Sequence, residues 1–333
     1  MNKKAIVLLS GGLDSILATK LMLEQSIDVE AVNYHIAFAA CGGNSAECDP
    51  ASKAAKILKV PLKTFDITKE YLEVFKNPKY GYGANVNPCI DCKIFMLKKA
   101  KEYMKEIGAS FLVTGEVLGE RPMSQRKDAL HIIERDAGVK GILLRPLSAK
   151  LLEETVPERE GVVDREKLLD IRGRSRKPQM ALAKKFEIKE YPSPAGGCLL
   201  TDPGFAKRVK DLIRHDALSV DDLVLLAVGR HFRLSKAAKL IVGRDKRENG
   251  LLGSLVKPDD IVFKLKDHEG PLSILRGEAD KVSIELAAGI TAYHTKFRKE
   301  DLLRVDYWGN GKTGRETLSV KSAGQEIIES FRI

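Results

Sequence analysis

Six residues near the start of the chain, Ser10–Ser15, combine small and hydroxyl side chains with one carboxylate. They directly follow the apolar segment 5–9, and helical periodicity begins at once with Leu17 and Leu21. Glycines allow backbone N–H groups to approach an anion, serine hydroxyls add donors, and a helix N-terminus favours negative charge. No lysine follows the glycines, which excludes the G-x-x-x-x-G-K-S/T loop. The pattern predicts a phosphate-binding loop; an ordinary Ser/Gly turn is the alternative.

Three of the five cysteines could share one centre. Cys89 and Cys92 form a C-x-x-C at the start of a predicted helix. The N-terminus of a helix stabilises thiolate, and this spacing lets both sulfurs face one point. Cys198 follows two glycines, which allow a cofactor or substrate to approach closely. Three cysteines would leave one iron of a 4Fe–4S cluster open, at a position that could hold sulfide.

Other interpretations of the cysteines remain open. The C-x-x-C pair could be ordinary half-buried thiols, with Cys198 unrelated to them. A structural zinc site would need a fourth ligand, which Cys41, Cys48 or His35 could supply. We favour a non-catalytic role for Cys41 and Cys48. Structural disulfides are not expected, because we expect the chain in the reducing cytosol.

Alternating strands and helices must position these groups. Strands are predicted at 5–9, 29–34, 62–66, 111–114 and 142–145, with helices at 14–24, 51–58 and 92–107. Strands separated by helices form a doubly wound parallel sheet, so the fold class is α/β. Ligands of such sheets bind at the carboxyl ends of the strands. The Ser10–Ser15 loop and segments 33–35 and 114–116 all lie at the ends of predicted strands, so we expect them to converge.

Dense Pro/Gly punctuation at 191–197 and 202–204 predicts a domain boundary near residue 203. The predicted domains are therefore 1–202 and 203–333. Beyond the boundary the pattern changes, and we expect a smaller α+β domain. Its predicted helices are 205–214 and a segment near 289–295, and its strand-like segments are 223–228, 261–265 and 282–286.

The loop Ser-Gly-Gly-Leu-Asp-Ser resembles the PP-loop, S-G-G-x-D-S, of the N-type ATP pyrophosphatases, whose fold is adenine nucleotide α-hydrolase-like. In that family the loop holds the pyrophosphate of ATP while AMP is transferred to a substrate oxygen. The resemblance implies ATP contacts from Ser10, Gly11, Gly12, Leu13, Asp14 and Ser15. It also implies that Asp14 helps to hold Mg²⁺.

Residues 1–201 further resemble tRNA thiolation enzymes. The order of Asn-Pro-Cys-Ile-Asp-Cys-Lys at 87–93, Val-Thr-Gly-Glu at 113–116 and a late Gly-Gly-Cys is similar to that of the tRNA 2-thiouridylases. Segments that resemble the tRNA 4-thiouridine synthetases are 114–119, 124–125 and 144–147. The resemblance implies that Tyr34 and Gly115 lie near the adenosine. It implies nucleotide contacts from Lys93 and Gln125.

The three cysteines resemble the iron–sulfur branch of these enzymes, in which Cys89, Cys92 and Cys198 would bind the 4Fe–4S cluster. The implied reaction adenylates a uridine oxygen, and sulfide then displaces AMP. Classical 2-thiouridylases carry one cysteine in the first motif, so this chain departs from them. In the alternative mechanism Cys198 carries a persulfide that Cys89 or Cys92 resolves. Either route needs a sulfide or persulfide donor as a partner.

A polyanionic partner is indicated by the formal net charge of +10 and by clustered basic residues. The run beginning at Gly243 weakly resembles the NFACT-R RNA-binding module. We therefore expect tRNA, or another structured RNA, as a partner. The predicted RNA contacts are Arg172, Arg174, Arg176, Lys177, Arg230, Arg233, Arg244, Lys246 and Arg247.

Other function classes are limited by the sequence. No apolar run reaches 18 residues, and the N-terminal apolar segment is too short for a signal peptide. We therefore expect a cytoplasmic protein with no membrane partner. Two alternatives to an ATP-dependent sulfurtransferase remain, namely an amide-forming ligase that uses ammonia and a non-catalytic RNA-binding protein. Only the sulfurtransferase needs the cysteines.

Overall fold

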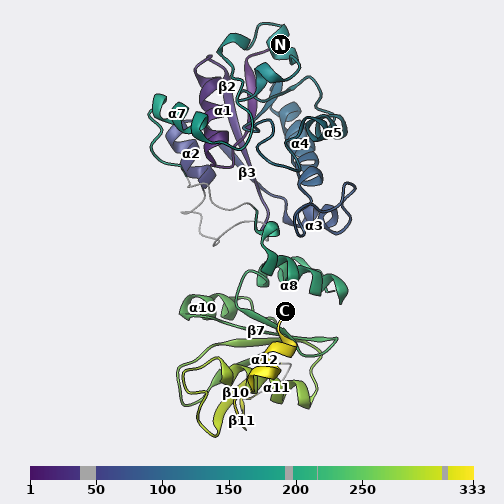
Figure 1. The fold of residues 1–333 in the computed structure, drawn as a ribbon, viewed down its shortest axis with the longest axis vertical. Helices are drawn as coiled ribbons and strands as arrows, with labels where there is room; N and C mark the ends of the chain where they lie inside the picture. Colours follow the sequence, from purple (N-terminus) through teal and green to yellow (C-terminus); the bar gives the residue numbers. More distant parts are fainter. Residues whose placement is uncertain (38–49, 192–197, 216, 310–313) are drawn as a thin grey trace. The chain divides into compact units, whose positions relative to one another are not determined.

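The computed structural model describes residues 1–37, 50–191, 198–215, 217–309 and 314–333. These residues divide into two compact units, Met1–Thr201 and Asp202–Ile333 (Figure 1). Cys41 and Cys48 lie outside the described residues. Within the described ranges, no helix is both long and apolar enough to cross a membrane.

The first unit contains a parallel sheet with the strand order β3-β2-β1-β4-β5. Its strands are β1 (Lys4–Leu8), β2 (Asp28–His35), β3 (Leu62–Asp66), β4 (Phe111–Thr114) and β5 (Leu143–Leu144). In the centre of the sheet, Ala5 of β1 lies opposite Val29 on one side and Phe111 on the other. Strands β1 and β4 are apolar and buried, as expected for a sheet covered on both faces. The predicted doubly wound α/β fold is confirmed.

Helices cover both faces of this sheet (Figure 1). One face carries α1 (Leu13–Leu23), α2 (Pro50–Leu58) and α7 (Lys177–Lys185). The other face carries α4 (Cys89–Glu106) and α5 (Lys127–Ala137), and α3 (Thr68–Lys76) packs against α4. The short elements of the unit are α6 (Val156–Arg159), η2 (Ala149–Leu151), η3 (Arg165–Lys167) and η4 (Leu199–Thr201). Separate apolar cores fill the two sides of the sheet.

The second unit contains an antiparallel sheet with the order β11-β10-β8-β9-β7-β6. Its strands are β6 (Arg230–Arg233), β7 (Ala238–Val242), β8 (Ile261–Leu265), β9 (Ser273–Gly277), β10 (Leu303–Gly309) and β11 (Glu316–Val320). Its helices are α8 (Pro203–Arg214), α9 (Val220–Leu225), α10 (Lys246–Ser254), α11 (Lys281–Tyr293) and α12 (Gln325–Phe331). Helix α11 packs on the sheet and forms the apolar core with it. The unit is therefore α+β.

Two strand predictions in this unit are wrong. Segment 223–228 overlaps α9, and segment 282–286 lies inside α11. Both helices are started by a capping side chain that accepts a backbone N–H three residues on, Ser219 for α9 and Asp280 for α11. Such caps satisfy the first free N–H groups of a helix. The alternating apolar residues of 282–286 mimic a strand, but the cap and the small residues that follow favour a helix.

Candidate active site

The Ser10–Ser15 loop connects β1 directly to α1. Gly11 has a φ of +76°, and a Cβ on it would lie 2.2 Å from the carbonyl carbon of Pro50, so only glycine fits there. The Ser15 hydroxyl donates to the carbonyl of Gly12 at 2.8 Å, and the Ser10 and Ser15 hydroxyl oxygens are 3.3 Å apart. The loop therefore presents its serine hydroxyls and the N-terminus of α1 at one place.

The end of β4 meets this loop. A Cβ on Gly115 would lie 2.5 Å from both the carbonyl carbon of Asp14 and the nitrogen of Ser15. The absence of a side chain at Gly115 therefore lets the two backbones touch. The loops after β1 and β4 come together at the carboxyl edge of the sheet, as in other doubly wound sheets.

Asp14 is surrounded by groups from two later segments of the chain. Burial raises the pKa of its carboxyl, while Arg176, Gln179 and Arg121 act in the opposite direction. The Arg176 Nη2 lies 4.0 Å from the Asp14 Oδ2, and the buried Oδ1 has no hydrogen-bond partner among the described residues. Carboxylate oxygen is the ligand type that Mg²⁺ prefers. The orphaned oxygen of Asp14 therefore fits the predicted Mg²⁺ role.

Glu120 is a second carboxylate at this place, and sequence reasoning missed it. Burial and the charge of Asp14 raise its pKa, which places the two carboxyl groups within electrostatic reach of each other. Its position in the loop after β4, beside a segment predicted to bind the nucleotide, was the available signal. A divalent cation between the two carboxylates would relieve their repulsion.

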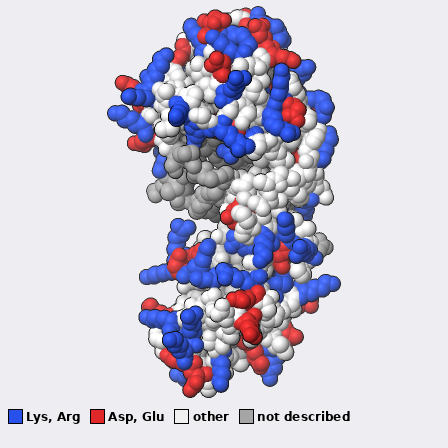
Figure 2. Space-filling view, viewed as in Figure 1, with Lys and Arg blue, Asp and Glu red and all other residues white. Residues whose placement is uncertain are grey.

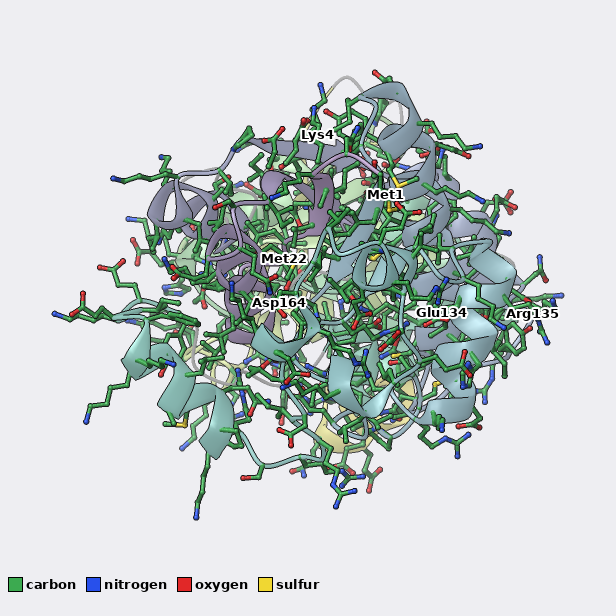
Figure 3. The ribbon with its side chains drawn as sticks, turned by 90° about the horizontal axis from the view of Figure 1, so that it is seen from above. Met1, Lys4, Met22, Glu134, Arg135 and Asp164 are labelled. Carbon is green, nitrogen blue, oxygen red and sulfur yellow. The ribbon has the colours of Figure 1, made fainter. Side chains whose placement is uncertain are left out.

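Lys93 is held beside a buried carboxylate. Its Nζ lies 3.5 Å from the Glu116 Oε1, and the Arg145 Nε donates to the Glu116 Oε2 at 3.0 Å. Burial opposes the charge of Glu116, but Lys93 and Arg145 hold its pKa below the usual value. Arg145 also pairs with Glu134, which points inward from α5, whereas the next residue, Arg135, points outward (Figure 3). Lys93 is thus oriented by a buried ion-pair network.

The three predicted cysteines gather around one phenol, Tyr71 of α3. Helix α4 begins at Cys89, so Cys89 and Cys92 both lie in its first turn. Burial raises the pKa of Tyr71, and further contributions come from Cys92, Cys198 and Cys89. The Tyr71 hydroxyl forms a hydrogen bond with Cys92. Tyr71 was not identified from the sequence, because helix α3 was not predicted.

The two thiols of α4 differ in their surroundings. Loss of solvent raises the pKa of Cys92 to about 11, and contacts with Tyr71 and Lys93 only partly oppose this. Burial also raises the pKa of Cys89. The charges of Lys93 and Arg121, and hydrogen bonds with Asn87 and Ser124, act to lower it. Cys89 therefore has the more cationic surroundings.

The fit of a 4Fe–4S cluster is partial. Three thiols are the right donor set for a cluster with one open iron, and all three act on Tyr71. However, no three His, Cys, Asp or Glu side chains in the described part of the chain are arranged to hold a metal ion. The structure thus brings the sulfurs to one region without assembling a metal centre.

The remaining predicted nucleotide residues have structural contacts of their own. Tyr34, near the end of strand β2, stacks on Phe65 with ring centroids 5.8 Å apart, and burial raises its pKa. The Gln125 Oε1 accepts the backbone N–H of Arg121 at 3.0 Å, and its carbonyl accepts that of Gly119 at 2.7 Å. Gln125 therefore shapes the loop that carries Glu120 and Arg121.

The basic run 172–177 crosses the loop that follows β4. Arg172 forms an isolated parallel β-bridge with Leu118, and the Gly173 N–H donates to the Leu118 carbonyl at 2.8 Å. Arg172, Arg174 and Lys177 are exposed, whereas Arg176 turns toward Asp14. The run thus borders the Ser10–Ser15 loop.

The predicted RNA contacts of the second unit divide into two groups. Arg233 forms two hydrogen bonds to Asp211, at 3.1 and 2.5 Å, and both side chains are largely buried. The other residues lie on β6 or around the start of α10, where Lys and Arg gather on the surface (Figure 2): Arg230, Arg244, Lys246 and Arg247. Arg244 is paired with Glu248. Arg233 is therefore a structural residue in this fold.

Comparisons with known proteins match the two units separately. Residues 1–156 match the family described as thiamine biosynthesis protein (ThiI), and residues 229–332 match the NFACT protein RNA binding domain. The tRNA-specific 2-thiouridylase MnmA of Caldicellulosiruptor saccharolyticus is 28% identical over 66% of this chain and 63% of its own length. The probable tRNA sulfurtransferase of Thermoanaerobacter pseudethanolicus is 30% identical over 44% of this chain and 37% of its own. The chain thus spans less than two thirds of these relatives.

Among solved structures, a 4-thiouridine synthetase–RNA complex with bound ATP is 20% identical, with 67% of this chain and 52% of that chain covered and a TM-score of 0.37. The U34-tRNA thiolase NcsA of Methanococcus maripaludis with its 4Fe–4S cluster is 18% identical, with 67% and 69% covered and a TM-score of 0.35. By the family matches and the curated relatives, the chain resembles the PP-loop tRNA thiolation enzymes over its first 156 residues and the NFACT RNA-binding module over residues 229–332.

Proposed function

We propose that this protein uses ATP to replace a uridine oxygen of tRNA with sulfur. The observation that carries the proposal is the position of Arg121. Its charge acts on the carboxyl of Asp14 and also on the thiol of Cys89. The Ser10–Ser15 loop and Cys89 are therefore both within electrostatic reach of one basic side chain, which supports a reaction that needs the two.

The first step adenylates the substrate. The uridine carbonyl oxygen attacks the α-phosphate of ATP, the bond to the β-phosphate breaks, and pyrophosphate leaves with that electron pair. The Ser10–Ser15 loop would bind the phosphates, and Arg121 would offset the charge on the phosphates. Mg²⁺ held by Asp14, with Glu120 beside it, would neutralise further phosphate charge. The oxygen of uridine then departs as part of AMP.

The second step brings sulfur to the same carbon. We assign Cys89, Cys92 and Cys198 to the sulfur site, with Tyr71 donating a hydrogen bond at Cys92. A 4Fe–4S cluster held by these cysteines would supply an iron with an open position for sulfide. In the alternative route, the outer sulfur of a persulfide on Cys198 attacks the carbon, and the thiol of Cys89 or Cys92 then attacks the Cys198 sulfur, so that the S–S bond breaks, a disulfide forms and the outer sulfur stays on the uridine. In both routes sulfur forms its bond to carbon as AMP leaves.

The RNA partner is assigned to the basic segments of both units. Exposed residues of the run 172–177 border the Ser10–Ser15 loop, and Lys246 and Arg247 lie exposed on the first turn of α10. Basic side chains at this density suit contacts to RNA phosphates. The second unit, which matches an RNA-binding domain, would then hold the tRNA while the first unit reacts with it. A cytoplasmic location follows from this substrate.

Mass spectrometry of the modified nucleosides in bulk tRNA, from cells with and without the gene, tests the proposal. We expect one thiolated uridine to disappear with the gene and to return with the wild-type protein. It should not return with Cys89→Ser, Cys92→Ser or Cys198→Ser. An unchanged set of thiolated nucleosides would contradict the proposal.

The same cysteine variants separate the other functions. An amide-forming ligase would keep its full activity without the three thiols. A non-catalytic RNA-binding protein would release no AMP from ATP, and its RNA affinity would not respond to ATP. Iron and sulfide analysis of anaerobically purified protein decides between the cluster and the persulfide.

A further inference from the structure

We infer that Arg176 and Gln179, at the start of α7, are positioning residues for the polyphosphate of a nucleoside triphosphate bound over the Ser10–Ser15 loop. The inference rests on the proposed use of ATP. Arg176 then belongs to the nucleotide site rather than to the predicted RNA surface, and Gln179 joins it there.

The buried side chain of Gln179 supports this inference. The side chain is fully buried, yet neither its amide nitrogen nor its amide oxygen has a hydrogen-bond partner among the described residues. Buried amides are normally paired, and an unpaired one is costly. Helix α7 packs against α1, and this packing brings the Gln179 side chain beside the carboxyl of Asp14, whose pKa it helps to lower, although no hydrogen bond of normal length joins the two side chains. An unpaired amide at that place is ready for a ligand.

The guanidinium of Arg176 supports the same inference. Its Nη2 lies 4.0 Å from the Asp14 Oδ2, which is too long for a hydrogen bond, and its buried Nε has no partner in the described part of the chain. The guanidinium therefore offers donors that the protein leaves unused. Its side chain is only 22% exposed, unlike Arg172 and Arg174 in the same run. Arg176 is poorly placed to reach a large RNA surface.

The unpaired polar groups of Asp14, Arg176 and Gln179 fit one kind of ligand. Asp14 Oδ1 accepts, whereas Arg176 and the Gln179 amide donate, and all three adjoin the N-terminus of α1. A guanidinium, an amide N–H and a helix N-terminus bind phosphate oxygens, and a free carboxylate or amide oxygen binds the accompanying divalent cation. A polyphosphate with a bound cation satisfies all of them together. A single-stranded base or an amine would leave some of these groups unpaired.

The position of α7 is fixed by the loop after β4. The bridge from Arg172 to Leu118 and the hydrogen bond from Gly173 to Leu118 hold the segment ahead of α7. That same loop carries Glu120 and Arg121, which also act on Asp14 or its neighbours. The ligand would therefore be enclosed by α1, the loop after β4 and the start of α7.

The test compares Arg176→Ala with Arg174→Ala, its exposed neighbour in the same run. The probe for nucleotide binding is the α,β-methylene analogue of ATP with Mg²⁺, measured by calorimetry on the full chain. A second measurement gives the affinity for bulk tRNA at fixed salt. We expect Arg176→Ala to weaken nucleotide binding about 10- to 100-fold, the usual range for a charged hydrogen bond, with tRNA affinity unchanged. Arg174→Ala should do the reverse.

Gln179 is tested with Gln179→Ala and Gln179→Glu. The alanine variant should weaken nucleotide binding about 3- to 10-fold, and the glutamate, which repels phosphate, should weaken it further. Equal binding of the nucleotide by both variants and the wild type would overturn the inference.

The two proposals fail in different ways. If the wild type binds the ATP analogue but thiolates no uridine, the proposed function fails and the positioning roles of Arg176 and Gln179 stand. If the wild type thiolates uridine while Arg176→Ala binds the analogue normally, only the inference fails. Equal loss of tRNA affinity in Arg176→Ala and Arg174→Ala, with nucleotide affinity intact, would return Arg176 to the RNA surface.

Discussion

Gly115, at the end of β4, lies against Asp14 so closely that a Cβ on it would be 2.5 Å from the carbonyl carbon of Asp14. This contact joins the Ser10–Ser15 loop to the strand next to β1. The distance leaves no room for a side chain, so the loop and the strand must separate if one is added. Binding of ATP should therefore depend on this glycine.

We predict that Gly115→Ala disrupts the nucleotide site. Overpacking of this kind typically costs about 1–3 kcal/mol of unfolding free energy, and the displaced loop should bind ATP at least tenfold more weakly. Chemical denaturation and calorimetry measure the two effects. Gly250→Ala in α10 is the control, because a Cβ there meets nothing within 4 Å. Normal ATP binding by Gly115→Ala would show that the close contact is unimportant.

The buried network around Glu116 should be sensitive to the loss of one partner. Arg145→Met leaves the Glu116 carboxylate, which is 2% exposed, without its hydrogen-bonded counter-charge, which typically costs about 3–5 kcal/mol. The double variant Arg145→Met/Glu116→Gln removes that charge and should be more stable than the single variant. Urea unfolding of both proteins measures this. Equal stability of the two variants would argue against a charged Glu116.

Arg233 and Arg247 should behave differently, although both were predicted to bind RNA. Arg233→Ala leaves the largely buried Asp211 without its bidentate partner and should lower the unfolding free energy on the order of 3 kcal/mol. Arg247→Ala should leave stability unchanged and reduce the salt dependence of tRNA binding by about one charge. Denaturation and binding at several salt concentrations test both. A large loss of tRNA affinity in folded Arg233→Ala would contradict the assignment.

His294 should make the second unit less stable in mild acid. Burial lowers its pKa to about 4, and Arg230, Arg332 and Arg298 lower it too, whereas an unfolded histidine titrates near 6.5. The unfolded chain therefore takes up the proton first. The neutral ring makes its full contribution to the unfolding free energy above pH 6.5. This contribution is lost as the pH falls toward 4, and the loss is about 2 kcal/mol at pH 5.

The measurement for His294 is urea unfolding at pH 7 and pH 5. His294→Gln should show a smaller loss between the two pH values than the wild type, because glutamine does not titrate. Histidines elsewhere affect both proteins equally, so the difference between them isolates His294. Identical pH dependence in the two proteins would contradict the buried, neutral state of this ring.

Local pattern was sufficient for much of the first unit. The Ser10–Ser15 loop follows an apolar strand and precedes a largely apolar, buried helix, so its place could be read from neighbouring residues. The Cys89–Cys92 pair starts α4 as predicted. Segments of fewer than ten residues hold this information, because strand and helix periods are local properties of the chain.

Local pattern failed where two periods coincide. Segment 282–286 alternates like a strand, but the side chain of Asp280 caps a helix there. In the same way Ser219 caps α9. Both caps are short-range hydrogen bonds, and they outweigh the alternation of apolar residues. A prediction from the sequence must therefore choose between a strand and a helix that the same residues permit.

By itself, the sequence determined the α/β fold, the position of the Ser10–Ser15 loop and the candidate cysteines, because each rests on short local patterns of residues. Only the tertiary structure decided what surrounds them. Tyr71 reaches the cysteines, and Gln179 reaches Asp14, across many intervening residues, through the packing of α3 on α4 and of α7 on α1. Such contacts depend on how apolar faces pack, and no local pattern specifies which polar side chains then meet.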